Sequence, residues 1–370
     1  MTDTTTRAGT STSPLTITRI PVPESLDAPD AGPFLAIARI GNALCRQDTG
    51  HDYFDQDAAE ILPGWQDQTD RLQFGFAAER DGEIIGILTL MVPLEDGATN
   101  VEFDPMVDPT RWGEGVEEAL MELVETEARA LGRPVLQTWT LHRPDQGGAR
   151  LESPTGFGSI PADDRQTRLM LDHGYSFEQT ERNSVFDLTG SFDGIDRMLA
   201  DARAVAGDDY RIVSWTTPTP DRYKDGFAYA ISRMSTDVPT GEIVWTEEKW
   251  DAARVERRDK RLIDGGHTVS VACVEHVPTG TIAAYNELVI AADHTAATHQ
   301  WGTLVLTEHR GRRLGTIVKC ANLKRWRELV PQSPRVSTFN AEENRHMLDI
   351  NEAIGFVPAS YAGAWKKTLD

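Results

Sequence analysis

The sequence predicts a mixed α/β fold that occurs twice along one chain. Three observations support this: the chain has 370 residues, its apolar residues recur at both strand and helix spacing, and one order of elements appears in each half. At about 100–200 residues per domain, this length corresponds to two domains, each large enough to bury a core. The composition, with 39% hydrophobic and 26% charged residues, is that of a globular protein.

The first half predicts a strand, a helix, three strands, a long helix, a strand and a short helix. Asp81-Gly82 separates the first two of the three central strands and is typical of a two-residue hairpin. Gly132 is expected to end the long helix, because glycine tolerates the left-handed backbone that stops a helix. The expected strands are 16–20, 72–78, 84–92, 98–107 and 135–141, and the expected helices are 34–45, 116–131 and 169–173.

The second half repeats this order, with a Pro-Thr-Gly turn at 278–280. One segment, 141–166, has no counterpart there and is rich in Pro, Gly, Ser and Asp. We expect it to be a surface insertion, with a lid over the first half as the alternative. The expected strands of the second half are 211–215, 268–275, 281–290, 298–306 and 336–340, and the expected helices are 222–234, 247–263, 314–329 and 344–354.

These elements predict four segments: a disordered tail over 1–14, an N-terminal domain over 15–189, a linker helix over 190–208 and a C-terminal domain over 209–370. The tail is rich in Thr and Ser and lacks the apolar core of a signal peptide. No apolar run approaches the ~18–20 residues of a membrane span. Three distant cysteines predict neither a disulfide framework nor a metal site, and a cytoplasmic location is the simplest expectation.

The 58 acidic and 37 basic residues give a formal charge of 37 − 58 = −21. This charge argues against a nucleic acid or an anionic membrane as partner, because both require a basic face. The exception is residues 305–335, which hold eight basic and two acidic side chains. A small bound polyanion would explain this basic run, and the alternative is a solvated helix face.

Residues 305–315, VLTEHRGRRLG, lead from an expected strand into the long helix of the second half. The start of a helix presents unpaired N–H groups and the positive end of its dipole, which favours phosphate. Gly311 and Gly315 allow a close approach of the backbone. Other phosphate motifs fail on spacing: G-x-x-x-x-G-K-[ST] is absent, and the run that begins at Gly113-Glu114-Gly115 ends in Glu where a third glycine is required.

The following segment, 338–356, contains Asn340, Asn344 and the pair Gly355-Phe356. Together, the two stretches resemble the GNAT superfamily of acyl-CoA-dependent N-acetyltransferases. The first is similar to its motif V-x-P-x-x-[RQ]-G-x-G-x-[GA], and the second to its strand, N-x-x-x-N, helix and G-F. The resemblance is specific over 298–356, and the repeated order extends it to tandem members such as those common among actinobacterial acetyltransferases. It implies two tandem GNAT-like mixed sheets flanked by helices.

The resemblance implies acetyl-CoA as cosubstrate, with coenzyme A as product. Residues 310–315 would hold the pyrophosphate, residues 304–306 would offer backbone groups to the pantetheine and the thioester, and Asn344 would bind the pantetheine arm. The full expected cofactor set is Leu304, Val305, Leu306, Arg310, Gly311, Arg312, Arg313, Leu314, Gly315, Thr316, Asn340 and Asn344.

Two departures from the family pattern concern the chemistry. Arg313 replaces the middle glycine of the loop motif. Asn351 stands where the family often has a tyrosine that protonates the leaving thiolate, and an amide cannot give up a proton. Tyr361 or a water molecule is the expected replacement.

The first half has an equivalent stretch at 107–117, in which Trp112 replaces the Arg or Gln and Glu117 replaces the last glycine. Carboxylates at a helix start complement its dipole and repel a pyrophosphate. We therefore expect no cofactor in the N-terminal domain.

Acetyl transfer to an amine requires a base, because an ammonium group has no free electron pair. Glu287 is the leading candidate and His299 the second; an ordinary strand carboxylate and a structural histidine are the alternatives. The acidity of the chain favours a cationic amine acceptor, and an oligomer is possible. Two other functions stay open: a non-catalytic acetyl-CoA sensor, and an interaction module that keeps the GNAT fold.

Overall fold

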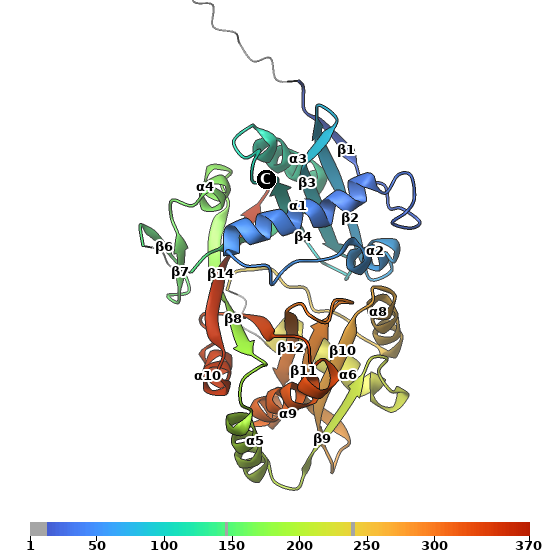
Figure 1. Ribbon diagram of the computed structural model, residues 1–370, viewed down its shortest axis with the longest axis vertical. Helices are drawn as coiled ribbons and strands as arrows, with labels where there is room; N and C mark the ends of the chain where they lie inside the picture. Colours follow the sequence, from blue (N-terminus) through green and yellow to red (C-terminus); the bar gives the residue numbers. More distant parts are fainter. Residues whose placement is uncertain (1–12, 145–146, 238–240) are drawn as a thin grey trace, which may run out of the picture.

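The computed structural model describes residues 13–144, 147–237 and 241–370. The expected tail over 1–14 therefore lies almost entirely outside the described residues. Twelve strands form one mixed sheet in the order β1-β2-β3-β4-β5-β14-β8-β13-β12-β11-β10-β9, with helices on both faces (Figure 1). Within the described ranges, no helix has the length and apolar character needed to cross a membrane.

The first half places α1 and α2 on one face of the sheet and α3 on the other. Ile87 packs toward α1 and Leu88 toward α3, because successive strand residues point to opposite faces. Asp81 (φ 56°) and Gly82 (φ 80°) form the expected hairpin turn with both residues left-handed. The elements are β1 (Thr16–Arg19), α1 (Gly32–Thr49), α2 (Ala58–Gln66), β2 (Arg71–Arg80), β3 (Glu83–Pro93), β4 (Asn100–Val107), α3 (Val116–Ala130), β5 (Val135–His142), α4 (Arg165–Asp172) and β8 (Ser176–Asp187).

The second half repeats this arrangement, with α5 and α9 on one face and α6 and α8 on the other. Leu288 packs in the cluster around α9, and its neighbour Val289 packs in the cluster that contains α6 and α8 residues. The elements are α5 (Asp193–Ala206), β9 (Tyr210–Thr216), α6 (Asp221–Ser232), α7 (Met234–Asp237), α8 (Ala252–Asp264), β10 (Thr268–His276), β11 (Thr281–Ile290), β12 (Thr298–Val305), a 3-10 turn (Thr307–His309), α9 (Leu314–Leu329), β13 (Arg335–Ala341), α10 (Arg345–Ile354) and β14 (Val357–Thr368).

Three local features differ from the sequence expectation. The segment 141–166 contains a short hairpin, β6 (Arg150–Glu152) with β7 (Ser159–Pro161). Helix α2 was not expected, because its nine residues include a proline and a glycine. Helix α8 begins at Ala252 rather than at residue 247, since the Asp251 carboxylate caps it by accepting the Arg254 N–H at 2.7 Å.

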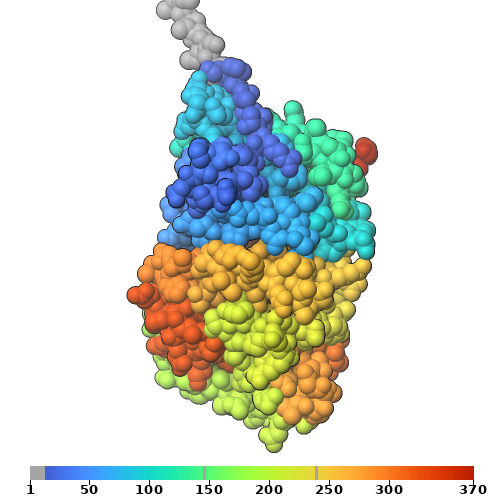
Figure 2. Space-filling view, turned by 90° about the vertical axis from the view of Figure 1, so that its right-hand side faces the viewer, coloured from blue at the N-terminus to red at the C-terminus, as the bar shows by residue number. Residues whose placement is uncertain are grey.

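The two expected sheets are joined into one by an exchange of strands between the halves. The last strand of the chain, β14, pairs with β5 of the first half (Tyr361 opposite His142) and with β8. In return, β8 of the first half pairs with β13 of the second (Asp187 opposite Arg335). Figure 1 shows β14, in red, running from the second half into the first beside β8, and Figure 2 shows the halves in contact across the middle of the molecule. The two expected mixed sheets are present and continuous through the exchanged strands, while the domain limits at 189 and 209 remain a prediction.

Candidate active site

Strands β12 and β13 pair in parallel only at Thr298–Val336 and His299–Ser337, and then diverge. The divergence leaves a cavity of about 620 Å³, here called the splay cavity. Both strands and the loop after β12 line it, through residues 300–305, Arg310, Gly311, Gly315, 338–341, Asn344, His346, Met347 and Ile350.

A second cavity of about 430 Å³, here called the loop cavity, adjoins the splay cavity at the start of α9. The two cavities share Val305, Arg310, Gly311 and Gly315. Together they bring all but two of the twelve expected cofactor residues to one place; the ten are Leu304, Val305, Arg310, Gly311, Arg313, Leu314, Gly315, Thr316, Asn340 and Asn344.

The two exceptions are Leu306 and Arg312. Leu306 is buried, and its backbone N–H donates to the Ala283 carbonyl at 2.9 Å, so this N–H is already committed to a partner. Arg312 is exposed, and its guanidinium carbon lies 5.5 Å from the ring centroid of Tyr210. Neither residue lines the two cavities.

Arg313 adopts the backbone that the replaced glycine would have. Its φ of 54° and ψ of 24° are left-handed, and Gly115, at the equivalent position before α3, has φ 82° and ψ 14°. This conformation costs a residue with a Cβ roughly 1–2 kcal/mol. The loop therefore keeps its shape despite the departure, and the first turn of α9 still presents N–H groups that lack intrahelical acceptors.

Position 315 has room for a Cβ atom, although the residue there is glycine. A Cβ atom built there would lie 3.4 Å from Cδ1 of Ile350 and 3.6 Å from Cγ2 of Val305, which are ordinary contacts. Gly315 lines both cavities, so a longer side chain at this position would extend into them. Beside it, the Arg310 guanidinium donates to the carbonyls of Val305 at 3.2 Å and Asp237 at 3.3 Å, so it fixes the loop against α7.

The basic run over 305–335 is less concentrated in space than in sequence. Only Arg310 and Arg313 of its eight cations line the two cavities, and the Lys319 side chain is fully buried. The remaining four besides Arg312 contact partners elsewhere: Lys324 pairs with Asp196, Arg325 bonds Thr216, Arg327 lies over Phe192 and Arg335 bonds Tyr53. An anion at the start of α9 would therefore meet mainly backbone N–H groups.

In the first half, a carboxylate of the chain occupies the equivalent loop. Glu117 is 2% exposed, and its Oε1 accepts the Gly113 N–H at 2.5 Å. Glu114 pairs with Arg80 and Arg111, each at 2.9 Å. These contacts satisfy groups that a pyrophosphate would need, which supports the expectation that this half binds no cofactor.

The two expected bases lie outside the splay cavity. Glu287 is 4% exposed and accepts a hydrogen bond from Arg258 at 2.6 Å, so its carboxylate is already held by a buried guanidinium. His299 lies beside Phe54, with 6.3 Å between ring centroids. Burial, and then the neighbouring His267, lower the pKa of His299 to about 4. Their catalytic roles stay predictions.

Asn351, which stands where the family often has a tyrosine, and Tyr361, the expected replacement for that acid, also do not line the two cavities. Asn351 is 1% exposed; its Oδ1 accepts from Lys319 Nζ at 2.8 Å, and its Nδ2 donates to Asn340 Oδ1 at 2.8 Å. Asn351 therefore acts on the site through Asn340, which does line the splay cavity. Tyr361 lies in β14 opposite Arg182 and is not among the residues that line either cavity.

Sequence reasoning missed Glu181, which lines the splay cavity from β8. It lies opposite Ala341 of β13, and its Oε1 accepts the indole N–H of Trp139 at 2.9 Å. Burial raises the pKa of Glu181 against the opposing effect of that hydrogen bond, and the charge of Glu343 adds to the rise. No local signal marked this residue, because it reaches the second half only through the strand exchange.

Comparison with known proteins supports the fold on both halves. Residues 39–151 match the family model of the acetyltransferase (GNAT) family. This match falls on the first half, whereas the quoted motifs lie in the second, so each half carries a family signal. None of the curated proteins matches the sequence.

Solved structures show the tandem GNAT fold. A tandem GNAT protein from the clavulanic acid biosynthesis pathway is similar over 96% of this chain and 98% of its own, with a TM-score of 0.73 and 22% identity. A GCN5-related N-acetyltransferase from Sphaerobacter thermophilus has a TM-score of 0.58 at 16% identity, covering 96% of this chain and 97% of that one. A fungal GH3 beta-N-acetylglucosaminidase with a GCN5-related glucosamine N-acetyltransferase region has a TM-score of 0.60 at 14% identity; the match covers 98% of this chain and 39% of the longer one. The tandem GNAT fold implied by the sequence motifs is confirmed.

Proposed function

We propose that the protein is an acetyl-CoA-dependent N-acetyltransferase that acts on a primary amine of a small molecule by direct transfer in a ternary complex. One observation carries this proposal: in the second half, a glycine-lined loop at the start of α9 opens onto the cavity between two diverging strands. The first-turn N–H groups of α9 would hold the pyrophosphate, and the open edge of β12 would hold the pantetheine. Acetyl-CoA supplies the activated acyl group.

The acceptor amine must lose a proton, and we propose Glu181 as the group that takes it. Among the carboxylates that line the splay cavity, Asp237 is held by Arg233 and Thr307, whereas Glu181 accepts from a neutral indole. A raised pKa brings this carboxylate closer to the working pH of a base. Asn351 is a positioning residue that orients Asn340.

A glutamate at position 315 tests the cofactor site directly. Gly315→Glu copies Glu117 of the first half, and a Cβ atom there makes only ordinary contacts. A carboxylate also complements the helix dipole, so we expect the variant to fold, which its thermal transition checks. We expect the variant to bind acetyl-CoA at least 100-fold more weakly in calorimetric titration, because its carboxylate occupies the anion site; two orders of magnitude correspond to about 2.7 kcal/mol. An unchanged affinity would contradict the proposal.

Glu117→Gln is the matched control in the first half, and it should leave one coenzyme A per chain. A stoichiometry of two would show that the first half also binds the cofactor. Thiol release with acetyl-CoA and a panel of amines then separates the enzyme from the alternative sensor, which would bind acetyl-CoA without turnover. A cytoplasmic location and the oligomeric state stay predictions.

A further inference from the structure

A cavity of about 620 Å³ lies where the two halves meet, and we call it the junction cavity. Residues of β2, β3 and β4 line it from the first half, and the segment 244–250 and α8 line it from the second. Trp245 and Trp301 line both this cavity and the splay cavity. The junction cavity and the splay cavity, where we expect the acetyl group, therefore adjoin at these two tryptophan side chains.

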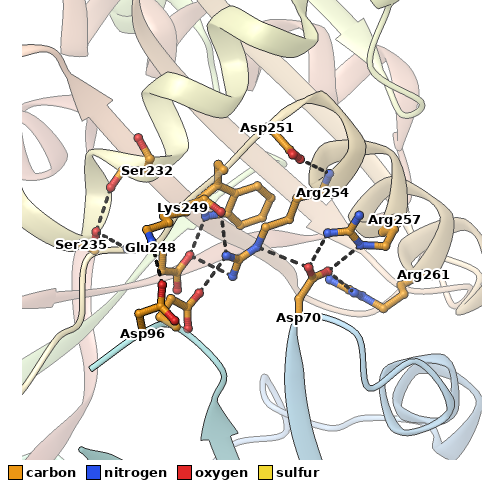
Figure 3. A network of polar contacts seen from close by, with 12 residues as sticks. Asp70, Asp96, Ser232, Ser235, Glu248, Lys249, Asp251, Arg254, Arg257 and Arg261 are labelled. Carbon is orange, nitrogen blue, oxygen red and sulfur yellow. Dashed lines mark hydrogen bonds and ion pairs between the residues drawn. The ribbon is translucent and has the colours of Figure 1, made fainter. Parts of the chain in front are cut away.

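Most charges of the junction cavity have partners of the opposite sign. Asp70 pairs with Arg257 at 2.5 Å and with Arg261 at 3.0 Å, and Figure 3 shows these two side chains and Arg254 converging on it. Arg254 pairs with Glu95 at 2.8 Å. On the same helix, Arg258 pairs with Glu287 at 2.6 Å. These ion pairs join α8 to the first half and fix the part of the junction cavity that α8 lines.

One face of β4 is the exception. Asn100, Glu102 and Asp104 alternate along the strand and share this face. Asn100 is 2% exposed, yet its Oδ1 has no hydrogen-bond partner among the described residues. Within the described ranges, no ion pair joins Glu102 or Asp104 to a cation within 4 Å, and the bond that Asp104 accepts, from Thr89 Oγ1, is 3.5 Å long. Among the described residues, Asn100 and Glu102 thus line the junction cavity with acceptors that lack a donor, and the exposed Asp104 follows them on the same face.

Each of the two carboxylates on this face disfavours the ionisation of the other. Burial, followed by the charge of Asp104, raises the pKa of Glu102 to about 7, while Arg71 opposes the rise and Glu248 adds to it. Arg71 lines the same cavity and offsets one of the two carboxylates of β4. Asp104 is exposed and lines the neighbouring first-half cavity of about 310 Å³, which shares Gln56, Ile61 and Gln73 with the junction cavity. A cation between these two carboxylates would lie where the two cavities adjoin, and it would stabilise the ionised form of Glu102.

We propose that the junction cavity binds the acceptor, and that this acceptor carries a second ammonium group held between Glu102 of this cavity and Asp104 of the neighbouring one. The reacting amine then extends past Trp245 and Trp301 into the splay cavity. An ammonium group supplies the donors that Asn100 and Glu102 lack, and the side chain of Trp245, which is 46% exposed, offers an apolar surface to the methylene chain. The substrate class is a diamine or a larger polycationic amine, and this inference rests on the proposed function.

The test compares two ligands of equal length, 1,8-diaminooctane and 8-amino-1-octanol, which differ only in the second ammonium group. Calorimetric titration of the full chain, alone and saturated with coenzyme A, should show the diamine binding at least tenfold more tightly. Glu102→Gln and Asp104→Asn together should remove this preference. Asp96→Asn is the control, since Asp96 is exposed at the rim, pairs with Lys249 at 3.0 Å and does not line the cavity.

Equal affinity for the two ligands, or a preference that survives the double variant, overturns the inference. Acetyl-CoA affinity is measured on the same samples to separate the two proposals. A diamine preference that depends on Glu102 and Asp104 in a protein that binds no acetyl-CoA would reject the proposed function and keep the cation site. Normal acetyl-CoA binding without that preference would reject the cation site and keep the proposed function.

Discussion

At the scale of single residues, positions 117 and 315 distinguish the two equivalent loops, because one carries a carboxylate and the other no side chain. Glu117 turns its carboxylate onto the Gly113 N–H, whereas Gly315 leaves the same region of the second half open. The loop backbone is the same in both halves despite different residues, because Arg313 adopts left-handed angles close to those of Gly115. We therefore expect the side chain at this position, more than the backbone, to decide whether each loop binds an anion.

The pH dependence of the rate distinguishes Glu181 from Glu287 as the base. Glu181 must be ionised to accept a proton, and burial raises its pKa, so the acid limb of kcat/KM should lie above the ordinary glutamate value of ~4.3. Glu181→Gln should lower kcat/KM by roughly 10²–10⁴-fold and abolish that limb. The measurement is a pH–rate profile with acetyl-CoA and an accepted amine.

Glu287→Gln provides the comparison for this profile. Removing one partner of a buried ion pair costs roughly 3–5 kcal/mol, so this variant should lose stability because Arg258 stays buried without its counter-ion. Its acid limb should match that of the wild type. An acid limb that disappears in Glu287→Gln and persists in Glu181→Gln would restore Glu287 as the base.

At the scale of elements, a buried polar contact joins α9, α10 and β13 beside the site. Lys319 of α9 is fully buried and donates to Asn351 of α10, which in turn donates to Asn340 of β13. Burial lowers the pKa of Lys319 to about 7. The sequence placed this lysine in a basic run, but the packing of α9 turned it inward.

Replacing this lysine should change how stability depends on pH. Between pH 7 and 10.5 the unfolded chain holds a proton on Lys319 that the folded protein has released, so stability rises with pH across this window. Relative to Lys319→Met, the wild type should gain up to about 1.4 kcal/mol per pH unit there. Urea unfolding of both proteins at pH 6.5 and 9.5 measures the difference.

Lys324→Met serves as the control, because the Lys324 side chain is 43% exposed and pairs with Asp196 at the surface. Its stability should run parallel to that of the wild type over the same pH range. Parallel curves for Lys319→Met as well would show that Lys319 keeps its proton when buried.

At the scale of the whole molecule, the exchange of β8 and β14 makes the halves depend on each other. β14 carries the fully buried Trp365, which packs with Phe177 and belongs to the core of the first half. β8 completes the sheet beside β13 and brings Glu181 to the splay cavity. Each half therefore takes part of its core or its site from the other.

This dependence predicts the behaviour of a split chain. Fragments 1–189 and 190–370 should each fail to unfold cooperatively alone, because each lacks the strand that its sheet takes from the other. Mixing or co-expressing them should restore one complex with a single thermal transition. Calorimetry and size-exclusion chromatography measure this, with the intact chain as the reference; a cooperative transition in either isolated fragment would contradict it.

Much of the fold follows from short-range signals. Asp81-Gly82 specifies its hairpin because both residues tolerate left-handed angles, and the apolar spacing of 116–131 and 314–329 specifies α3 and α9. The loop over 310–315 was also recognisable, since it combines glycines with the start of a helix. Helix α2 was not, because its proline and glycine oppose the helical preference that tertiary packing overrides.

The sequence by itself determined the α/β class, the order of most elements and the loop at the start of α9, because these depend on residues close together in the chain. Only the tertiary structure decided the joining of two sheets, the placement of Glu181 and the junction cavity. The physical reason is distance along the chain: β14 pairs with β5 more than 200 residues away, and local periodicity carries no information about such a partner.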